Sequence, residues 1–314
     1  MKKNLLLSAL IIPAALAMTS CMDSDGNRQE ANINYGGSLC FNYVTDIKDP
    51  TVAPFVSLAP QYSFNVEYYG GTITTSMSNI RLTSDGQQLS FRTPELKASN
   101  TNNGYTLTCT GSDIVPEGQS QSFVFDDFSV NITERSIVNA SGAYRYSPVY
   151  AINYLVNGRY RVKVFPTYYD VVGKMTSTAT VDKTAKTSER AIVSFSLNPD
   201  SSNPVTGKAT IEINDVTFAD NFTVSRLIAS DVPYTVNATG ISIRTDSETV
   251  YKVKDALGRD LPNAGLSDIV ISIDVPSGST SISMHANVTG LEGEKDAVEY
   301  DLRATLGYFI NTTN

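Results

Sequence analysis

Side chains capable of catalysis are few in this sequence and match no common catalytic pattern. His285 is the only histidine, and it lies in the alternating run 281–287, where a strand histidine is a better interpretation than a general base. Motifs of serine hydrolases, zinc proteases, phosphate-binding loops and dinucleotide-binding loops do not occur. We therefore expect no nucleophilic chemistry and no bound cofactor.

Acidic side chains are the remaining candidates for chemistry, because two carboxylates can act together in glycoside hydrolysis. The candidates are Glu67, Glu134, Asp126 and Asp127. Any acidic β-protein contains such residues, and the chain has no tryptophan to provide the platforms usual in sugar hydrolases. The sequence predicts a protein that is not an enzyme.

The first 20 residues have the pattern of an export signal. Lys2 and Lys3 precede an uncharged run, 5–17, which is shorter than the ~20 apolar residues of a membrane-spanning helix and contains Pro13. The run ends in Met18-Thr-Ser-Cys21, which resembles the lipobox of bacterial lipoproteins, although the family usually has leucine where Met18 stands. The resemblance implies cleavage before Cys21 and a lipid (diacylglycerol and palmitate) on its thiol, whereas the alternative is an ordinary secretory leader with a chance cysteine.

Asp23 and Asp25 follow in the short acidic segment 22–27. This segment resembles the one in Bacteroidetes lipoproteins that are exported to the outer face of the outer membrane, so it implies display at the cell exterior. A calcium loop is excluded because its glycine and glutamate would stand at the sixth and twelfth positions, where this chain has other residues. We expect residues 21–34 to be a flexible lipidated tether.

Cys40 and Cys109 remain once Cys21 is acylated. Outside the cytoplasm a disulfide between them would persist and would fasten the first strand to the first domain. The alternative is two buried thiols that act as small apolar side chains. Two cysteines and one histidine at these separations do not make a metal site.

Tyrosine side chains crowd into the segment 144–169. Four of them are candidate ligand-stacking residues, since a tyrosine ring combines a flat apolar face with a polar tip: Tyr144, Tyr146, Tyr168 and Tyr169. The alternative is that these rings alternate into the core and rim of the first domain.

The charge of the chain restricts its partners. Removal of Lys2 and Lys3 leaves 22 basic and 32 acidic residues, a net charge of −10. Nucleic acid and anionic lipid surfaces repel such a protein, so we expect no nucleic-acid partner. Acyl chains on Cys21 would supply membrane attachment without a membrane-binding face.

Alternation of apolar and polar residues predicts an all-β fold. It is clear in the runs 62–68, 128–132 and 159–164, and turn signals such as Asn157-Gly158 separate the runs. The expected architecture is two tandem antiparallel β-sandwich-like domains, at 35–183 and 184–314, with lipocalin-like barrels as the alternative. The division is placed in the polar segment 182–190. Similarity between the segments 105–111 and 234–240 also suggests an internal duplication.

These observations leave three hypotheses for function. The first is an accessory lipoprotein of the outer-membrane surface that binds a glycan or a protein without catalysis. The second is a tip or anchor component that resembles the fimbrillins. The resemblance implies that a polymerising subunit matures by cleavage at an arginine. Here Arg28 is too close to the lipid site, and cleavage at Arg190 would remove half the protein, so both arginines disfavour a polymerising subunit. The third hypothesis is a lipid carrier with a hollow barrel.

Overall fold

The computed structural model describes residues 30–307 except 68–69, 102–105, 119–122, 134–135, 139–143, 147–148, 201–202, 204, 221, 275–280 and 290–297. These residues form β-strands, with one 3-10 turn, η1 (Gly37–Leu39), and no α-helix. Every strand pairing among them is antiparallel. The all-β prediction and the two tandem sheets are confirmed. The described residues contain no helix with the length and apolar character to span a bilayer.

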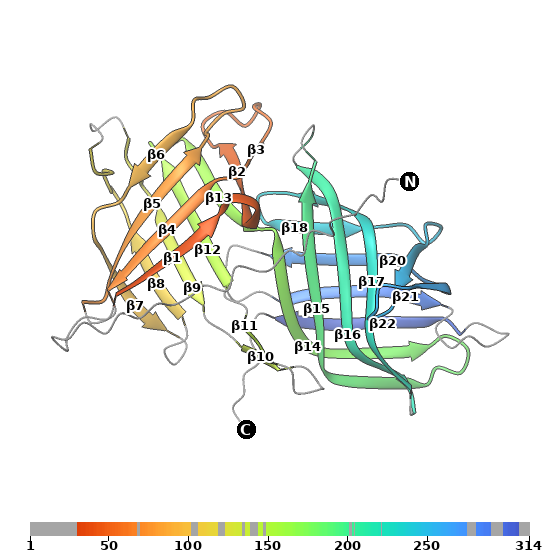
Figure 1. The fold of residues 1–314 in the computed structure, drawn as a ribbon. Coiled ribbons are helices and arrows are strands. Elements are labelled where there is room, and N and C mark those ends of the chain that lie inside the picture. Colours follow the sequence, from red (N-terminus) through yellow and green to blue (C-terminus); the bar gives the residue numbers. More distant parts are fainter. Residues whose placement is uncertain are drawn as a thin grey trace, which may run out of the picture.

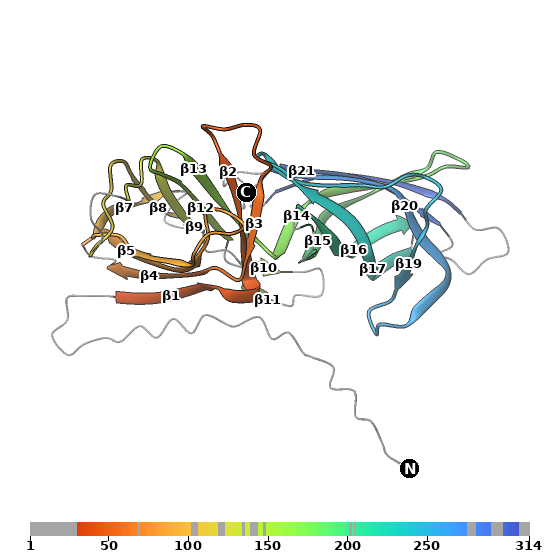
Figure 2. The ribbon, with the colours of Figure 1, turned by 90° about the horizontal axis from the view of Figure 1, so that it is seen from above.

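The first sheet follows the strand order β1-β4-β5-β7-β8-β9-β12-β13-β2-β3, with β6 beside β5. Its strands are β1 (Glu30–Gly36), β2 (Cys40–Asp46), β3 (Phe55–Leu58), β4 (Gln61–Glu67), β5 (Thr72–Ile80), β6 (Leu89–Arg92), β7 (Leu96–Thr101), β8 (Thr106–Gly111), β9 (Phe128–Thr133), β12 (Val149–Val156) and β13 (Tyr160–Pro166). The sheet folds over on itself, so that β1, β4 and β5 form one layer and β8, β9, β12 and β13 the other (Figure 2). Apolar side chains from both layers share one core.

The second sheet closes on itself. Its strands are β14 (Tyr168–Ala179), β15 (Ala185–Pro199), β16 (Thr206–Ala219), β17 (Phe222–Val236), β18 (Gly240–Arg244), β19 (Tyr251–Lys254), β20 (Asp260–Asp274), β21 (Ser281–Thr289) and β22 (Tyr300–Gly307). The path runs β16-β15-β14-β22-β21-β20-β18-β17 and returns to β16, while β19 lies against β17 and β20. Strands β14 to β17 cross over β20 to β22 (Figure 1). A separate pair, β10 (Ser136–Val138) and β11 (Tyr144–Tyr146), completes the described strands.

The two sheets share apolar packing where they meet. Phe41, Tyr43 and Phe165 of the first sheet belong to the same buried cluster as the interior of the second sheet. The rings of Phe41 and Phe165 stack with centroids 5.5 Å apart. Both rings belong to the first sheet, and the shared cluster places them against the interior of the second. Burial of rings of this size is worth about 1.5–3 kcal/mol each, so this packing stabilises the contact between the sheets.

Two predicted boundaries are wrong. The tether was expected to reach residue 34, but β1 begins at Glu30 because Ala31, Ile33 and Tyr35 alternate into the core. The domain division was expected at 183/184. In the structure it lies between Pro166 and Tyr168, because β14 pairs with β15 and β22 of the second sheet.

The strand topology does not reproduce an internal duplication. One sheet has two free ends in its strand order, whereas the other closes. The matched segments also differ: 106–111 is a single strand, β8, whereas 234–240 spans the end of β17, a turn and the first residue of β18. Short Tyr/Thr-rich matches of this kind reflect the composition of strands.

Candidate functional site

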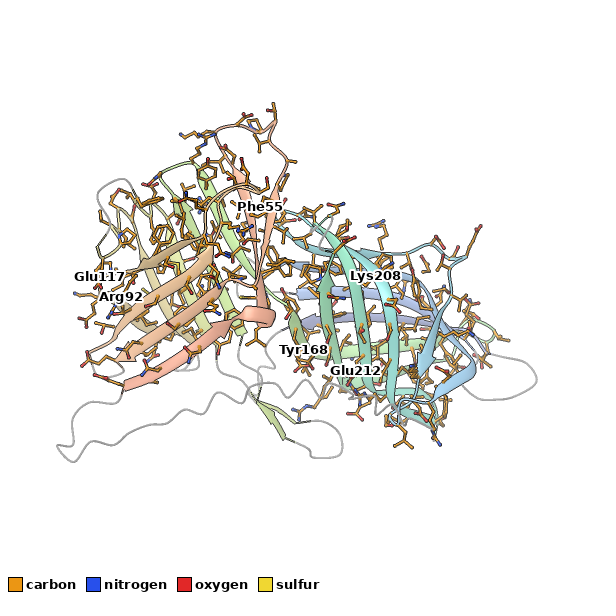
Figure 3. The ribbon with its side chains drawn as sticks, turned by 45° about the horizontal axis from the view of Figure 1, so that its top comes forward. Phe55, Arg92, Glu117, Tyr168, Lys208 and Glu212 are labelled. Carbon is orange, nitrogen blue, oxygen red and sulfur yellow. The ribbon has the colours of Figure 1, made fainter. Side chains whose placement is uncertain are left out.

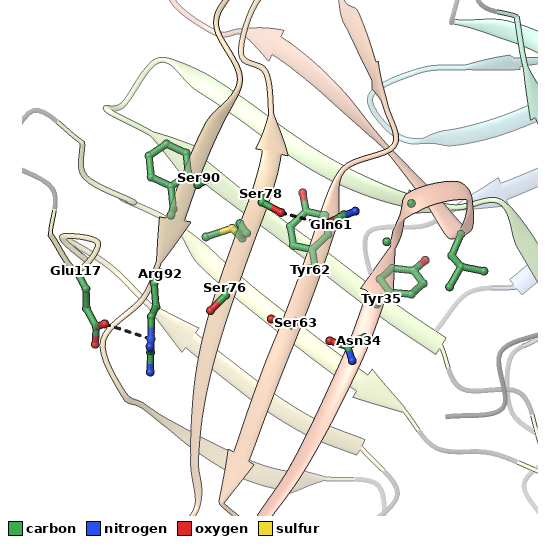
Figure 4. A pocket seen from close by; sticks show the side chains of 15 residues that line it. Asn34, Tyr35, Gln61, Tyr62, Ser63, Ser76, Ser78, Ser90, Arg92 and Glu117 are labelled. Atoms are coloured by element: carbon green, nitrogen blue, oxygen red, sulfur yellow. Dashed lines mark hydrogen bonds and ion pairs between the residues drawn. The ribbon is translucent and has the colours of Figure 1, made fainter. Parts of the chain in front are cut away.

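An open groove of about 730 Å³ lies on the outer face of β1, β4, β5 and β6 (Figure 4). Its lining is mostly small or polar, and the side chains that face outward are Asn34, Gln61, Ser63, Ser76, Ser78, Ser90 and Arg92. The alternation of the strands explains this composition, because successive side chains point to opposite faces. Tyr62, Met77 and Phe91 are at most 4% exposed and turn into the core, so they contribute backbone to the groove.

Cross-strand register places four of these side chains in one row across the sheet. Asn34 on β1 lies opposite Ser63 on β4, Ser63 lies opposite Ser76 on β5, and Ser76 lies opposite Arg92 on β6. We call this row the polar rung. Neighbouring strands are about 4.8 Å apart, so the polar rung extends over about 14 Å.

A second row lies two residues further along the strands. In this row Gly36 pairs with Gln61, and Gln61 pairs with Ser78. The Ser78 hydroxyl donates to Gln61 Oε1 at 3.3 Å. Hydroxyl and amide groups both donate and accept hydrogen bonds, so the floor of the groove suits a ligand that does the same.

An ion pair bounds the groove beside β6. Arg92 Nε lies 3.2 Å from Glu117 Oε2, and both side chains are more than half exposed. The backbone N–H of Glu117 also donates to the Arg92 carbonyl at 2.7 Å, which fixes the loop of Glu117 against the strand. An exposed pair of this kind stabilises the fold by no more than about 1 kcal/mol, so its groups remain able to turn toward a ligand.

Two backbone features shape the groove. Asn79 has φ 58° at an irregularity of the β5–β6 register between Met77 and Ile80, and such bulges bend a strand and increase its twist. At the other side Gly36 allows β1 to approach β4 closely. A Cβ there would lie 2.5 Å from the Gln61 Cα atom.

A buried network lies beneath the groove floor. The Tyr62 hydroxyl donates to Asn42 Oδ1 at 2.7 Å and lies 3.1 Å from the Tyr154 hydroxyl. Burial raises the pKa of Tyr62 and that of Tyr154 well above the ordinary value, so both hydroxyls stay protonated. Since Tyr62 stands between Gln61 and Ser63, the network holds the groove strand against the opposite layer.

The groove lacks the groups that common hydrolytic mechanisms use. Its lining contains one carboxylate, Glu117, where glycoside hydrolysis uses two. The described part of the lining contains no histidine or cysteine. Among the described residues, no three His, Cys, Asp or Glu side chains are grouped so that they could hold a metal ion. The arrangement of hydroxyl, amide and guanidinium groups can bind a polar ligand.

Of the four candidate ligand-stacking tyrosines, the structure describes the side chains of Tyr168 and Tyr169. Tyr169 is 2% exposed and packs in the core of the second sheet, so this prediction was wrong. Tyr168 is 37% exposed, and its hydroxyl donates to Asp170 Oδ1 at 2.8 Å. Tyr144 and Tyr146 lie on β11, opposite Val138 and Ser136, with side chains outside the described part of the chain.

Other tyrosines of the same segment follow the alternative interpretation. Tyr150 and Tyr154 are at most 4% exposed and belong to the core of the first sheet. Figure 3 shows Tyr168 well away from Arg92 and Glu117, so it takes no part in the groove. Tyr150 and Tyr154 of the tyrosine-rich segment 144–169 are therefore core residues of β12, where inward and outward positions alternate as in other strands.

Cys40 and Cys109 are both free and buried, so of the two possibilities the structure has the two apolar thiols and not the disulfide. The Cys40 Sγ atom donates to the Pro60 carbonyl at 3.9 Å. Burial raises the pKa of Cys40 well above its ordinary value and that of Cys109 to about 11. Cys21, Asp23 and Asp25 lie outside the described residues.

Sequence reasoning missed the groove. Its signal was the presence of small polar residues at alternate positions, as in Ser76 and Ser78 of β5 or Ser63 of β4. Each strand showed this pattern separately, but only the pairing of β1, β4, β5 and β6 brings the residues together.

A scan of the chain against protein-family models finds no match, and a search among curated proteins finds no relative.

Proposed function

We propose that the protein is a non-catalytic binding protein, displayed on the outer-membrane surface by a lipid on Cys21, and that the groove on β1, β4, β5 and β6 is its ligand site. The polar rung carries the proposal. It gathers hydroxyl, amide and guanidinium groups from four strands on one open face, in a groove of about 730 Å³. Ligand sites for small molecules are concave and have a few convergent polar groups.

The position of the groove suits display on a tether. β1 is the first described strand, and Asn34 on β1 belongs to the polar rung, so the groove is built onto the strand that follows the lipidated segment. The segment 21–29 could extend to about 30 Å, enough to hold the domain clear of the lipid headgroups.

The lipid-carrier alternative finds less support. A carrier needs an interior with room for acyl chains, whereas large side chains occupy the interior of the second sheet. Phe195, Phe218 and Ile211 in that interior are at most 1% exposed. Close packing of this kind leaves few voids larger than a water molecule.

Ligand binding is tested with the soluble chain 22–314 on arrays of glycans and of peptides, together with two variants. Ser76→Phe places a ring in the middle of the groove, while Thr74→Phe places one on the same strand and face but outside the lining. We expect binding to a ligand that Ser76→Phe abolishes and Thr74→Phe preserves. Binding that both variants retain would place the site elsewhere.

Attachment is tested by metabolic labelling with a palmitate analogue. We expect the wild-type chain to incorporate label and Cys21→Ala to incorporate none. Proteolysis of intact cells then tests display, since a surface-exposed body is cut while a periplasmic one is protected. An unlabelled wild-type chain would contradict the anchor.

A further inference from the structure

We infer that the ligand of the groove is a linear, uncharged oligosaccharide of about three sugar rings, which lies across the strands along the polar rung. This inference rests on the proposed function and adds the chemical class, length and orientation of the ligand.

The first argument concerns the backbone of the groove floor. β4 lies between β1 and β5, and β5 lies between β4 and both β6 and β7, so the ladders use the backbone groups of these strands on either side. A peptide that binds by adding a strand needs a free edge with unpaired N–H and C=O groups. β1 is such an edge strand, but a peptide added there would lie beside the floor and parallel to the strands, not across the polar rung. The floor offers side-chain hydroxyls and amides instead, which match a ligand rich in hydroxyl groups.

The second argument concerns charge. Among the described residues of the lining, Arg92 and Glu117 are the only Lys, Arg, Asp or Glu residues, and they pair with each other. The groove therefore has no net charge to balance a charged ligand. The whole chain has a net charge of −8, which further disfavours anionic sugars. A neutral ligand can bind in the groove without breaking the ion pair between Arg92 and Glu117.

The third argument concerns spacing. The polar rung presents one polar side chain about every 4.8 Å, which is close to the length of a single sugar ring. Its length of about 14 Å matches about three rings in a row. In this arrangement Asn34 contacts one end, Ser63 and Ser76 contact the middle, and Arg92 with Glu117 contacts the other end.

The groove provides no aromatic platform. Tyr35, Tyr62 and Phe91 are the aromatic residues of the lining, and all three are at most 6% exposed. Hydrogen bonds without ring stacking give weak binding, so we expect a Kd of about 0.1–1 mM. Many copies on one cell surface would raise the effective affinity for a polysaccharide through multivalency.

The experiment is calorimetry of the soluble chain 22–314 with neutral linear oligosaccharides of increasing length, with charged glycans and with peptides. We expect affinity to rise up to about three rings and then level off, and to be the same at low and high salt because the ligand is uncharged. Asn34→Ala and Arg92→Ala should each weaken binding of the trisaccharide about tenfold, which corresponds to about 1.4 kcal/mol. Asn65→Ala, on the same face of β4 outside the lining, should leave it unchanged.

The outcomes separate the two proposals. Binding of a peptide or a charged glycan that Ser76→Phe abolishes would overturn the oligosaccharide inference and leave the groove as a ligand site. Affinity that does not change with oligosaccharide length would overturn the orientation along the polar rung. Absence of any binding sensitive to Ser76→Phe would overturn both proposals.

Discussion

Ser63 and Ser76 lie directly opposite each other on β4 and β5, with both side chains on the open face of the first sheet. Strands usually carry β-branched and aromatic residues at such cross-strand pairs, because these stabilise the sheet. Two serines contribute little to sheet stability, and their small size is what leaves the groove open between Asn34 and Arg92. Stability must therefore come from the layer beneath.

We expect Tyr62→Phe to lower the free energy of unfolding by about 1–3 kcal/mol. The change removes the hydroxyl that donates to Asn42 Oδ1 and leaves a fully buried amide without this partner. Urea unfolding measures the difference. Tyr160→Phe is the control, since the contact of Tyr160 with Arg159 uses the ring face, and it should change stability by less than about 0.5 kcal/mol. Equal effects of the two variants would mean that the network does not hold the groove floor.

We expect Gly36→Ala to destabilise the fold by about 1–3 kcal/mol and to displace the end of β1. The new Cβ would lie 2.6 Å from the Pro60 carbonyl oxygen and closer still to the Gln61 Cα, and neither backbone atom can move cheaply. Gly111→Ala is the matched control, because its Cβ would meet only side-chain atoms, Ile114 Cδ1 at 2.6 Å and Cγ1 at 3.2 Å, which can turn away at lower cost than backbone. Thermal unfolding compares them. A Gly36→Ala variant as stable as Gly111→Ala would contradict the close approach of β1 to β4.

We expect Cys40 and Cys109 to react slowly with a thiol reagent in the folded soluble chain and quickly after unfolding without reductant. Burial both blocks access and, for Cys109, raises the pKa to about 11, so little thiolate is present near neutral pH. Reaction with a chromogenic disulfide in guanidinium counts the thiols. Their absence in the unfolded, unreduced chain would show that the two cysteines are bridged.

We expect the stabilising effect of Asp46 to disappear on acidification. Its hydrogen bond with Arg159 holds the pKa of Asp46 below the ordinary value. A carboxyl group with a lowered folded-state pKa stabilises the protein above its unfolded pKa of about 3.9, and this contribution is lost as the pH falls through the folded-state pKa. Asp46→Asn should thus be less stable than wild type at pH near 7 and equal to it in strong acid. Urea unfolding over this pH range is the measurement.

The pair is isolated by a double-mutant cycle of Asp46→Asn with Arg159→Gln. If the difference in free energy of unfolding between wild type and Asp46→Asn stayed constant down to strong acid, ionisation of Asp46 would not contribute to stability.

Local patterns in the sequence predicted much of the secondary structure. The alternating runs became strands, and Asn157-Gly158 forms the predicted hairpin turn between β12 and β13, with both residues at positive φ. The Arg159 N–H closes this turn on the Val156 carbonyl at 3.0 Å, and its two central positions have left-handed backbone, which Asn and Gly adopt most easily. The short alternation at Ala31, Ile33 and Tyr35 was missed because it begins inside a polar segment.

Pairing between distant segments could not be predicted in the same way. The composition of the polar segment 182–190 predicts a domain division, yet 185–190 begins β15, whose outer face is exposed in this part of the strand. The change of sheet falls near Thr167 instead, within a run of strands that shows no break in composition. The groove depends on register between β1, β4, β5 and β6, and register is set by the whole core.

The most direct test of the groove as a ligand site is an NMR titration of the soluble chain with the neutral trisaccharide that binds best in calorimetry. Binding along the polar rung predicts that the amide shift changes concentrate at Asn34, Ser63, Ser76 and Arg92 and at their strand neighbours, with the second sheet unaffected. Changes centred on the second sheet or around Tyr168, with none on β4 and β5, would contradict the account.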